Sequence, residues 1–165
     1  MYRYRIDHRK PQSSMNFTLL LQLAKTVDKG PIPNLFLANL NITRVNPEQT
    51  CKLSFGTKQA AIAYGLITCA AVVIASPKGI LLYHAGSGSI PKAVAKTLLL
   101  ELEITAANAM AAVGIYAVPG EWDNRYQQDA QELVDAGIPD NNVVLIEKVG
   151  ANFGINQMGQ VGIPC

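Results

Sequence analysis

Cysteine and histidine are the residue types in this chain that could form a nucleophile and its base. The chain has 165 residues, with three cysteines and two histidines, His8 and His84. A cysteine attacks as its thiolate, and a neighbouring imidazole lowers the cost of forming that thiolate. His84 follows Cys69 by fifteen residues along the same apolar segment. This spacing predicts a cysteine–histidine pair that could carry out nucleophilic catalysis.

The segment around these two residues predicts a β-hairpin. Residues 66–75 are a near-continuous run of apolar and β-branched side chains, which is typical of a buried strand. Residues 76–79 carry Pro77 and Gly79 at positions where a tight turn favours them. Residues 80–84 then form the second strand.

The length of the turn decides whether Cys69 and His84 can meet. A two-residue loop places Ser76 opposite Gly79 and, farther along, His84 opposite Ala71. Cys69 is then a diagonal neighbour of His84 on the same face, with Cα atoms roughly 7–8 Å apart and side chains within reach. A one-residue bulge at Gly79 would shift this register. Cys69 could still contact His84 in that case if it lies just before the regular strand.

Both residues also have a purely structural interpretation. A lone cysteine in an apolar strand is usually a small core hydrophobe. A histidine at a strand end is usually a capped or half-exposed side chain. The residues that surround the pair are what favours catalysis.

A Gly-Leu pair precedes Cys69, and an apolar strand, a turn and a second strand follow it. The residues are Ala63-Tyr64-Gly65-Leu66-Ile67-Thr68-Cys69-Ala70-Ala71-Val72-Val73, then Gly79-Ile80-Leu81-Leu82-Tyr83-His84, then Pro91. This pattern resembles the active-site hairpin of the CheD chemoreceptor deamidases. The same cysteine–histidine arrangement occurs in the catalytic domain of the cytotoxic necrotizing factors and in Burkholderia lethal factor type toxins, whose spacing is the more similar.

A second segment shows the same resemblance. Its residues are Leu133-Val134-Asp135-Ala136-Gly137-Ile138-Pro139 and, after a predicted strand, Val149-Gly150-Ala151-Asn152-Phe153-Gly154. They look like the late helix of the CheD family, its Gly-Ile-Pro exit and its Gly-x-Asn-x-Gly loop. The resemblance covers roughly residues 55–164, and the first fifty residues have no counterpart.

One position differs from the CheD pattern. That family places a threonine six residues before its cysteine as a third active-site residue, and this chain has Ala63 there. A third group normally orients the imidazole. The role could pass to a backbone carbonyl, as in the necrotizing factors, or to Thr57, Thr68 or Ser87.

The resemblance implies hydrolysis of a glutamine side-chain amide, and the partner it implies is a protein that carries a reactive glutamine. Cys69 would attack the amide carbon, His84 would move the protons, and backbone N–H groups near Cys69 would hold the oxyanion. An amine in place of water would give transglutamination. We expect neither a cofactor nor a bound metal.

Four functions are open at this point. The first is an effector or toxin that deamidates a host protein, and the second is a chemoreceptor deamidase of the CheD type. A non-catalytic binding module on the same fold would have an inert, buried Cys69. A thiol protease is the fourth, and nothing in the sequence supplies a peptide groove. The expected location is the bacterial cytoplasm, or a host cytosol after secretion or translocation.

The other elements place the hairpin in an α+β domain. We expect one or two short strands at 34–45, a helix at 92–112, a strand at 113–118, a helix at 124–136, a strand at 143–147 and a last pair of short strands after Gly150. The expected fold is a mixed, sandwich-like β-sheet with helices packed against one side. The resemblance implies the CheD and necrotizing-factor architecture.

Composition and charge limit the domain organisation and the kinds of partner that the chain can have. The chain is 49% hydrophobic and 16% charged, so one core is well supplied. We expect a polar tail at 1–14 and a single catalytic domain at 15–165. The apolar run at 15–24 predicts an amphipathic helix that is too short and too polar to span a bilayer. A net charge of +2 does not favour nucleic acid as the main partner, and we expect a monomer.

Other polar residues are interpreted structurally. Asp123, Asp129, Glu132 and Asp135 have the spacing of a solvated helix face rather than of a metal site. Asn152, in the glycine-rich loop, is interpreted as a turn residue that supports the hairpin.

Overall fold

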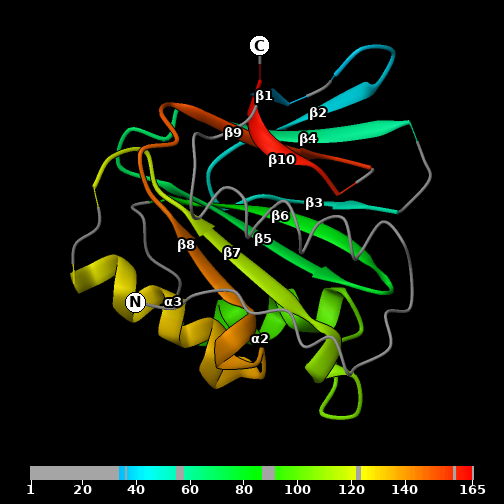
Figure 1. The fold of residues 1–165 in the computed structure, drawn as a ribbon, viewed down its shortest axis with the longest axis vertical. Helices are drawn as coiled ribbons and strands as arrows, with labels where there is room; N and C mark the ends of the chain where they lie inside the picture. The colour runs from blue at the N-terminus through cyan, green and yellow to red at the C-terminus, as the bar shows by residue number, and fades with distance from the viewer. Residues whose placement is uncertain are drawn as a thin grey trace.

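The computed structural model describes residues 34–35, 37–54, 58–86, 92–121, 124–157 and 159–164. These residues form two five-stranded sheets that pack face to face, and two α-helices cover the outer side of one sheet. Figure 1 shows this order of layers, with the helices at the bottom of the view. The expected α+β class with mixed, sandwich-like sheets is confirmed.

The hairpin lies in the sheet with strand order β3-β6-β5-β7-β8, which we call the hairpin sheet. Its strands are β3 (Thr50–Leu53), β5 (Ala70–Ser76), β6 (Gly79–Ala85), β7 (Val113–Ala117) and β8 (Val143–Ile146). β7 and β8 run parallel, and the other neighbours run antiparallel. Both strands of the predicted hairpin therefore lie inside the sheet rather than at an edge.

The other sheet has the strand order β1-β10-β9-β4-β2, and we call it the cover sheet. Its strands are β1 (Asn34–Leu35), β2 (Asn41–Val45), β4 (Gln59–Tyr64), β9 (Asn152–Asn156) and β10 (Val161–Pro164). β1–β10 and β2–β4 are parallel pairs, whereas β4–β9 and β9–β10 are antiparallel. The short strands expected at residues 34–45 and after Gly150 are confirmed.

Two apolar clusters hold the three layers together. One lies between the sheets and includes Val73 and Phe153. The other lies between the hairpin sheet and the helices and includes Val72, Leu98 and Leu133. The helices are α2 (Lys92–Glu101) and α3 (Asn124–Ala136), with the short 3-10 turns η2 (Ala109–Ala111) and η3 (Asp140–Asn142). Because β5 and β6 are covered on both faces, every residue in them is buried, which explains why their sequences are mostly apolar.

The hairpin turn has the two-residue loop that its sequence predicts. Ser76 pairs with Gly79, and His84 pairs with Ala71 in the same continuous register. The Lys78 N–H donates a hydrogen bond to Ser76 Oγ at 3.1 Å, which closes the turn. Of the two registers that the sequence left open, the structure has the one without a bulge at Gly79.

The helix predicted at residues 92–112 is wrong in its second half. The Ile104 N–H donates to Leu99 O at 2.9 Å, and the Glu103 N–H donates to Leu100 O at 2.9 Å. Glu103 between them has a φ of 55°. These are the bonds of a Schellman motif, whose left-handed position is usually glycine. Because a glutamate occupies that position, the sequence carried no stop signal.

Strands β3 and β4 are present where the sequence pattern predicted no element. β3 is short and mostly polar, with only its last residue, Leu53, buried. β4 is rich in alanine, which has a low strand propensity. Pairing with β6 and with β2 and β9 places them in the sheets, so tertiary contacts override the weak local preference.

The solvated-face interpretation of the acidic residues is wrong for Asp129. This residue is buried, and its Oδ2 accepts a hydrogen bond from the Tyr116 hydroxyl at 2.8 Å. Tyr116 projects from β7 into the cluster under the helices. The carboxylate is thus a polar contact between α3 and the hairpin sheet, whereas Asp135 is exposed as expected.

Several predictions fall outside the described residues. They concern the tail at 1–14, the helix at 15–24, Thr57, Ser87, Pro91 and Asp123.

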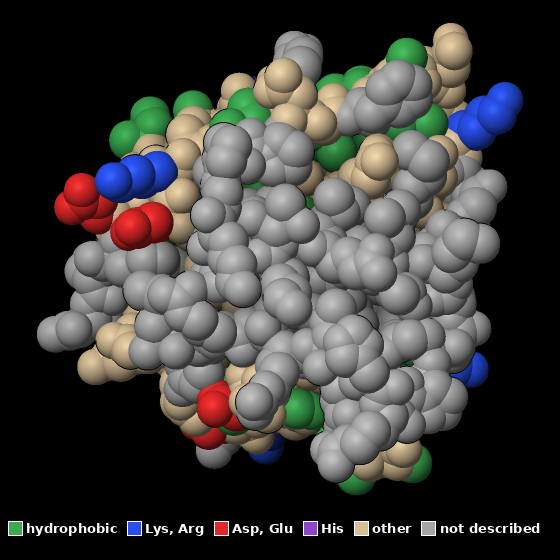
Figure 2. Space-filling model, viewed as in Figure 1, with side chains coloured by type: hydrophobic (Ala, Val, Ile, Leu, Met, Phe, Trp, Pro, Cys, Tyr) green, Lys and Arg blue, Asp and Glu red, His purple; other side chains and the backbone are tan. Residues whose placement is uncertain are grey.

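Charged side chains are scattered among the described residues on the face drawn in Figure 2. Figure 2 shows both signs around the edge of the face in view, without a patch of one sign among the described residues there. Lys148 and Glu121 form an exposed ion pair at 3.8 Å, a type of contact that contributes little to stability. In the described part of the chain, no helix has the length and apolarity needed to cross a membrane.

Candidate active site

His84 is completely buried, and its ring is held by the backbone of the cover sheet. Nδ1 lies 2.8 Å from the carbonyl oxygen of Val45, the last residue of β2. A carbonyl oxygen can only accept a hydrogen bond, so this contact assigns the proton to Nδ1. The neutral ring then presents a lone pair at Nε2, which is the form that a general base requires.

Nε2 of His84 is buried and has no hydrogen-bond partner among the described residues. Leaving a buried polar atom without a partner costs about 1–3 kcal/mol. Native structures contain few such atoms, and each calls for a physical reason. A nitrogen that waits for a thiol, a water molecule or a substrate is one such reason.

Cys69 lies immediately before β5, on the face of the hairpin that carries His84. Its side chain is partly buried and packs against the cluster that contains Ala71, the partner of His84. The backbone N–H and carbonyl of His84 bond towards β3 instead of β5. Ala71 and His84 are therefore a non-hydrogen-bonded pair, in which side chains approach most closely. Cys69 is the diagonal neighbour that the sequence predicted.

The thiol and the imidazole are not hydrogen-bonded to each other in this structure, since Nε2 has no partner among the described residues. Contacts of this kind are often long in the absence of substrate and tighten when it binds. The arrangement thus supplies a thiol and a base on one face of the hairpin.

The segment that leads into Cys69 is braced by the cover sheet. Gly65 has a φ of 73°, and its N–H donates to Asn152 Oδ1 at 3.2 Å. The Leu66 N–H donates to Ala151 O at 2.7 Å, and the Ile67 N–H donates to Gly65 O at 2.8 Å. Asn152 is a strand residue of β9 rather than the predicted turn residue, and its side chain supports the segment that leads into the hairpin at Cys69.

The group that orients the imidazole is the backbone carbonyl of Val45, one of the alternatives left open by the sequence. Thr68 is exposed and makes no hydrogen bond to His84, while Thr57 and Ser87 lie outside the described residues. Ala63, at the position of the missing threonine, pairs with Val45 in the β2–β4 ladder. Sequence reasoning could not single out Val45, because a backbone carbonyl leaves no trace in the residue type.

Cys51 is a second thiol near His84 that the sequence pattern did not single out. It pairs with Leu82 on β3, which makes it the diagonal neighbour of His84 on the opposite side from Cys69. Burial raises the pKa of the Cys51 thiol, and a hydrogen bond with Thr43 opposes this in part. A raised pKa disfavours the thiolate, so Cys69 is the better candidate nucleophile.

Cys51 and Cys69 are too far apart to form a disulfide. β3 and β5 lie on opposite sides of β6, so their backbones are about two strand spacings, or roughly 9.6 Å, apart. A disulfide needs Cα atoms within about 7 Å. No set of three or more His, Cys, Asp or Glu side chains that could hold a metal ion occurs in the described ranges.

No family model and no curated protein matches this chain. Among solved structures, the chain is similar to the crystal structure of the Bacillus licheniformis hypothetical protein YfiH, with 11% sequence identity and a TM-score of 0.41. The similarity covers 86% of this chain and 74% of that chain. A similarity of this size carries no inference about family or activity, so the case for a function depends on the site.

Proposed function

We propose that this protein is a thiol-dependent amidohydrolase that converts a glutamine side chain of another protein to glutamate. Cys69 is the nucleophile and His84 is the base. The observation that carries the proposal is the state of the buried imidazole. Nδ1 is held by Val45 O, and Nε2 is left without a partner among the described residues, on the face that carries Cys69.

The accessibility of the two groups supports a side-chain amide as the substrate. Cys69 is partly exposed, whereas His84 is fully buried. The segment before the cysteine presents Thr68 and Ile67 to solvent, and Ile67 is 82% exposed. A long, unbranched glutamine side chain can reach a thiol on such a surface without a groove for its backbone. The resemblance of the hairpin to the CheD and necrotizing-factor deamidases favours the same substrate.

The chemistry follows from the roles of the two side chains. Nε2 takes the thiol proton, and the sulfur of Cys69 attacks the amide carbon to form a carbon–sulfur bond. Backbone N–H groups next to Cys69 hold the oxyanion. Nε2 then gives the proton to the amide nitrogen, the carbon–nitrogen bond breaks, and ammonia leaves behind a thioester. A water molecule deprotonated by Nε2 cleaves the thioester, which yields glutamate and regenerates the thiol.

The rate of Cys69 alkylation as a function of pH, measured by intact-mass spectrometry, tests the pair. The reference protein is Cys51→Ser, and peptide mapping assigns the label to Cys69. We expect fast alkylation of Cys69 near neutral pH, because a thiol paired with an imidazole reacts as its thiolate. Adding His84→Ala should slow the reaction near neutral pH, because the thiolate loses its partner. His8→Ala, at the only other histidine, is the matched control and should change nothing.

Equal, slow alkylation with and without His84 would contradict the proposal. Cys69 would then be a structural residue, and a non-catalytic binding module would replace the enzyme. In that case, Cys69→Ser would leave partner binding intact. If the protein is a deamidase, Cys69→Ser abolishes turnover.

The choice between a host protein and a chemoreceptor as the substrate needs a separate assay. Incubation in ¹⁸O-labelled water marks each deamidated glutamine, because the new carboxylate oxygen comes from water. A chemoreceptor cytoplasmic fragment and a eukaryotic cell lysate are the two samples. Label in the fragment indicates a CheD-type role in the bacterial cytoplasm, and label in one lysate protein indicates an effector that acts in a host cytosol.

A further inference from the structure

The turn between β2 and β3, residues 45–49, holds the end of β6 that carries His84. The Glu48 N–H donates to the carbonyl oxygen of His84 at 2.8 Å, and the His84 N–H donates to Gln49 O at 3.1 Å. Val45, at the start of the same turn, supplies the oxygen that bonds Nδ1. One short turn therefore holds both the backbone and the ring of His84.

Glu48 adopts a backbone conformation that is unfavourable for its residue type. The Gln49 N–H donates to Asn46 O at 3.0 Å, and Glu48 has a φ of 67°. Pro47 followed by a residue with positive φ is the pattern of a type II turn, whose third position normally needs glycine. A glutamate at this position is strained, so the contacts of its side chain are the place to look for a reason.

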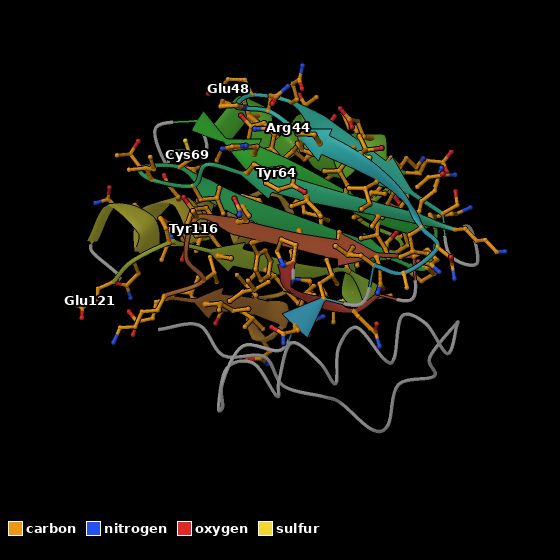
Figure 3. The ribbon with its side chains drawn as sticks, turned by 90° about the horizontal axis from the view of Figure 1, so that it is seen from above. Arg44, Glu48, Tyr64, Cys69, Tyr116 and Glu121 are labelled. Carbon is orange, nitrogen blue, oxygen red and sulfur yellow. The ribbon has the colours of Figure 1, made fainter. Side chains whose placement is uncertain are left out.

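The carboxylate of Glu48 contacts residues on both sides of His84. Oε2 accepts a hydrogen bond from the Tyr83 hydroxyl at 2.8 Å. Burial, together with this bond and the charge of Glu48, raises the pKa of Tyr83, so the hydroxyl remains a donor. Oε1 lies against Gly86, where any Cβ would collide with it. Figure 3 labels Glu48 and Cys69 toward the same side of the view.

We propose, on the basis of the function proposed above, that Glu48 is a positioning residue for His84. Bonded to Tyr83 and seated against Gly86, its carboxylate prevents the turn from moving along β6. Val45 O therefore stays at Nδ1, and the proton stays on that nitrogen. Nε2 keeps its lone pair available to Cys69, although Glu48 touches none of the reacting atoms.

Three substitutions separate the carboxylate from the backbone. Glu48→Gly removes the carboxylate and at the same time relieves the positive φ. Glu48→Gln keeps an oxygen that can accept the Tyr83 hydrogen bond. Glu103→Gly is the matched control, because Glu103 also has a positive φ, 55°, but ends α2 on the far side of the hairpin sheet from the cover sheet.

Two measurements compare these variants with the wild type. One is the rate of Cys69 alkylation near neutral pH, and the other is the tautomer of His84, read from the nitrogen-15 shifts of its ring. Glu48→Gly should slow alkylation roughly tenfold and mix the tautomers, because a displaced base loses much of its effect. Glu48→Gln should restore both readouts towards wild type, and Glu103→Gly should leave both unchanged.

A wild-type rate and a wild-type tautomer in Glu48→Gly would overturn the proposal. If that variant does not fold, Tyr83→Phe decides, because it removes the same hydrogen bond and should move both readouts in the same direction. If His84→Ala does not change the rate of Cys69 alkylation but Glu48→Gly still changes the tautomer of His84, the proposed function is wrong and the positioning role remains. An unchanged tautomer in both variants would refute the positioning role alone.

Discussion

Two buried polar groups, Nε2 of His84 and the carboxylate of Asp129, differ in whether they have a hydrogen-bond partner. Nε2 of His84 has no partner in the described part of the chain, at a cost of about 1–3 kcal/mol. Asp129 is buried as well, but its carboxylate accepts the Tyr116 hydrogen bond. The first atom fits a site that waits for a reacting group, and the second fits a contact that joins a helix to a sheet.

Asp129→Ala should lower the free energy of unfolding by about 1–3 kcal/mol, because the buried Tyr116 hydroxyl loses this acceptor. Asp129→Asn keeps an oxygen at the same place and should lose less. Urea denaturation followed by circular dichroism measures both changes. Equal losses in the two variants would show that the hydrogen bond is not what stabilises α3 on the sheet.

At the scale of elements, the β5–β6 hairpin sets the geometry of the candidate site. Its two-residue turn keeps His84 opposite Ala71, and this register keeps Cys69 on the face of His84. β3 packs closely along the other side of β6, at the level of Gly79. Anything that separates β3 from β6 at this turn disturbs the strand that carries His84.

Gly79→Ala should destabilise the protein by about 1–3 kcal/mol, because a strained backbone and a close contact act together. An added Cβ would stand 2.9 Å from Leu53 O, and Gly79 has a φ of 153°. Gly120→Ala is the control, since a Cβ there would have no atom within 4 Å. Thermal unfolding of the two variants checks this, and similar midpoints would mean that β3 can move away without cost.

At the scale of the whole molecule, the hairpin sheet is covered on both faces, and each cover buries a titratable side chain. Cys51 packs in the cluster between the sheets, and Tyr83 packs in the cluster under the helices. Burial is the first cause of the raised pKa of each residue. The folded protein therefore keeps protons that the unfolded chain releases at alkaline pH.

The free energy of unfolding should fall as pH rises past about 8.5 for the thiol and about 10 for the phenol, the ordinary pKa values of these groups. Below those values, the stabilisation from both groups is complete, and it is lost as pH rises towards their higher folded-state pKa values. Tyr83→Phe should reduce the loss at the upper end of this range. Urea denaturation at a series of alkaline pH values measures it, and an unchanged slope in Tyr83→Phe would contradict the expectation.

The parts of the fold that the sequence predicted are those with local signals. Pro77 and Gly79 mark the turn, and the apolar residues that follow and precede it mark two buried strands. The helix at 124–136 has an equally local end signal, Gly137, whose φ is 135°. The end of α2 was missed because Glu103 takes the left-handed position that glycine usually marks. β4 was missed because alanine has no strong preference for a strand.

The sequence by itself predicted the hairpin and narrowed its register to two alternatives, because turn chemistry and strand alternation act between near neighbours; the structure has the alternative that places Cys69 on the face of His84. Only the tertiary structure decided which atom orients the imidazole. Val45 O reaches His84 from 39 positions away in the chain and from the other sheet. Such a contact joins a backbone atom to a distant side chain, and neither residue type nor local period encodes it.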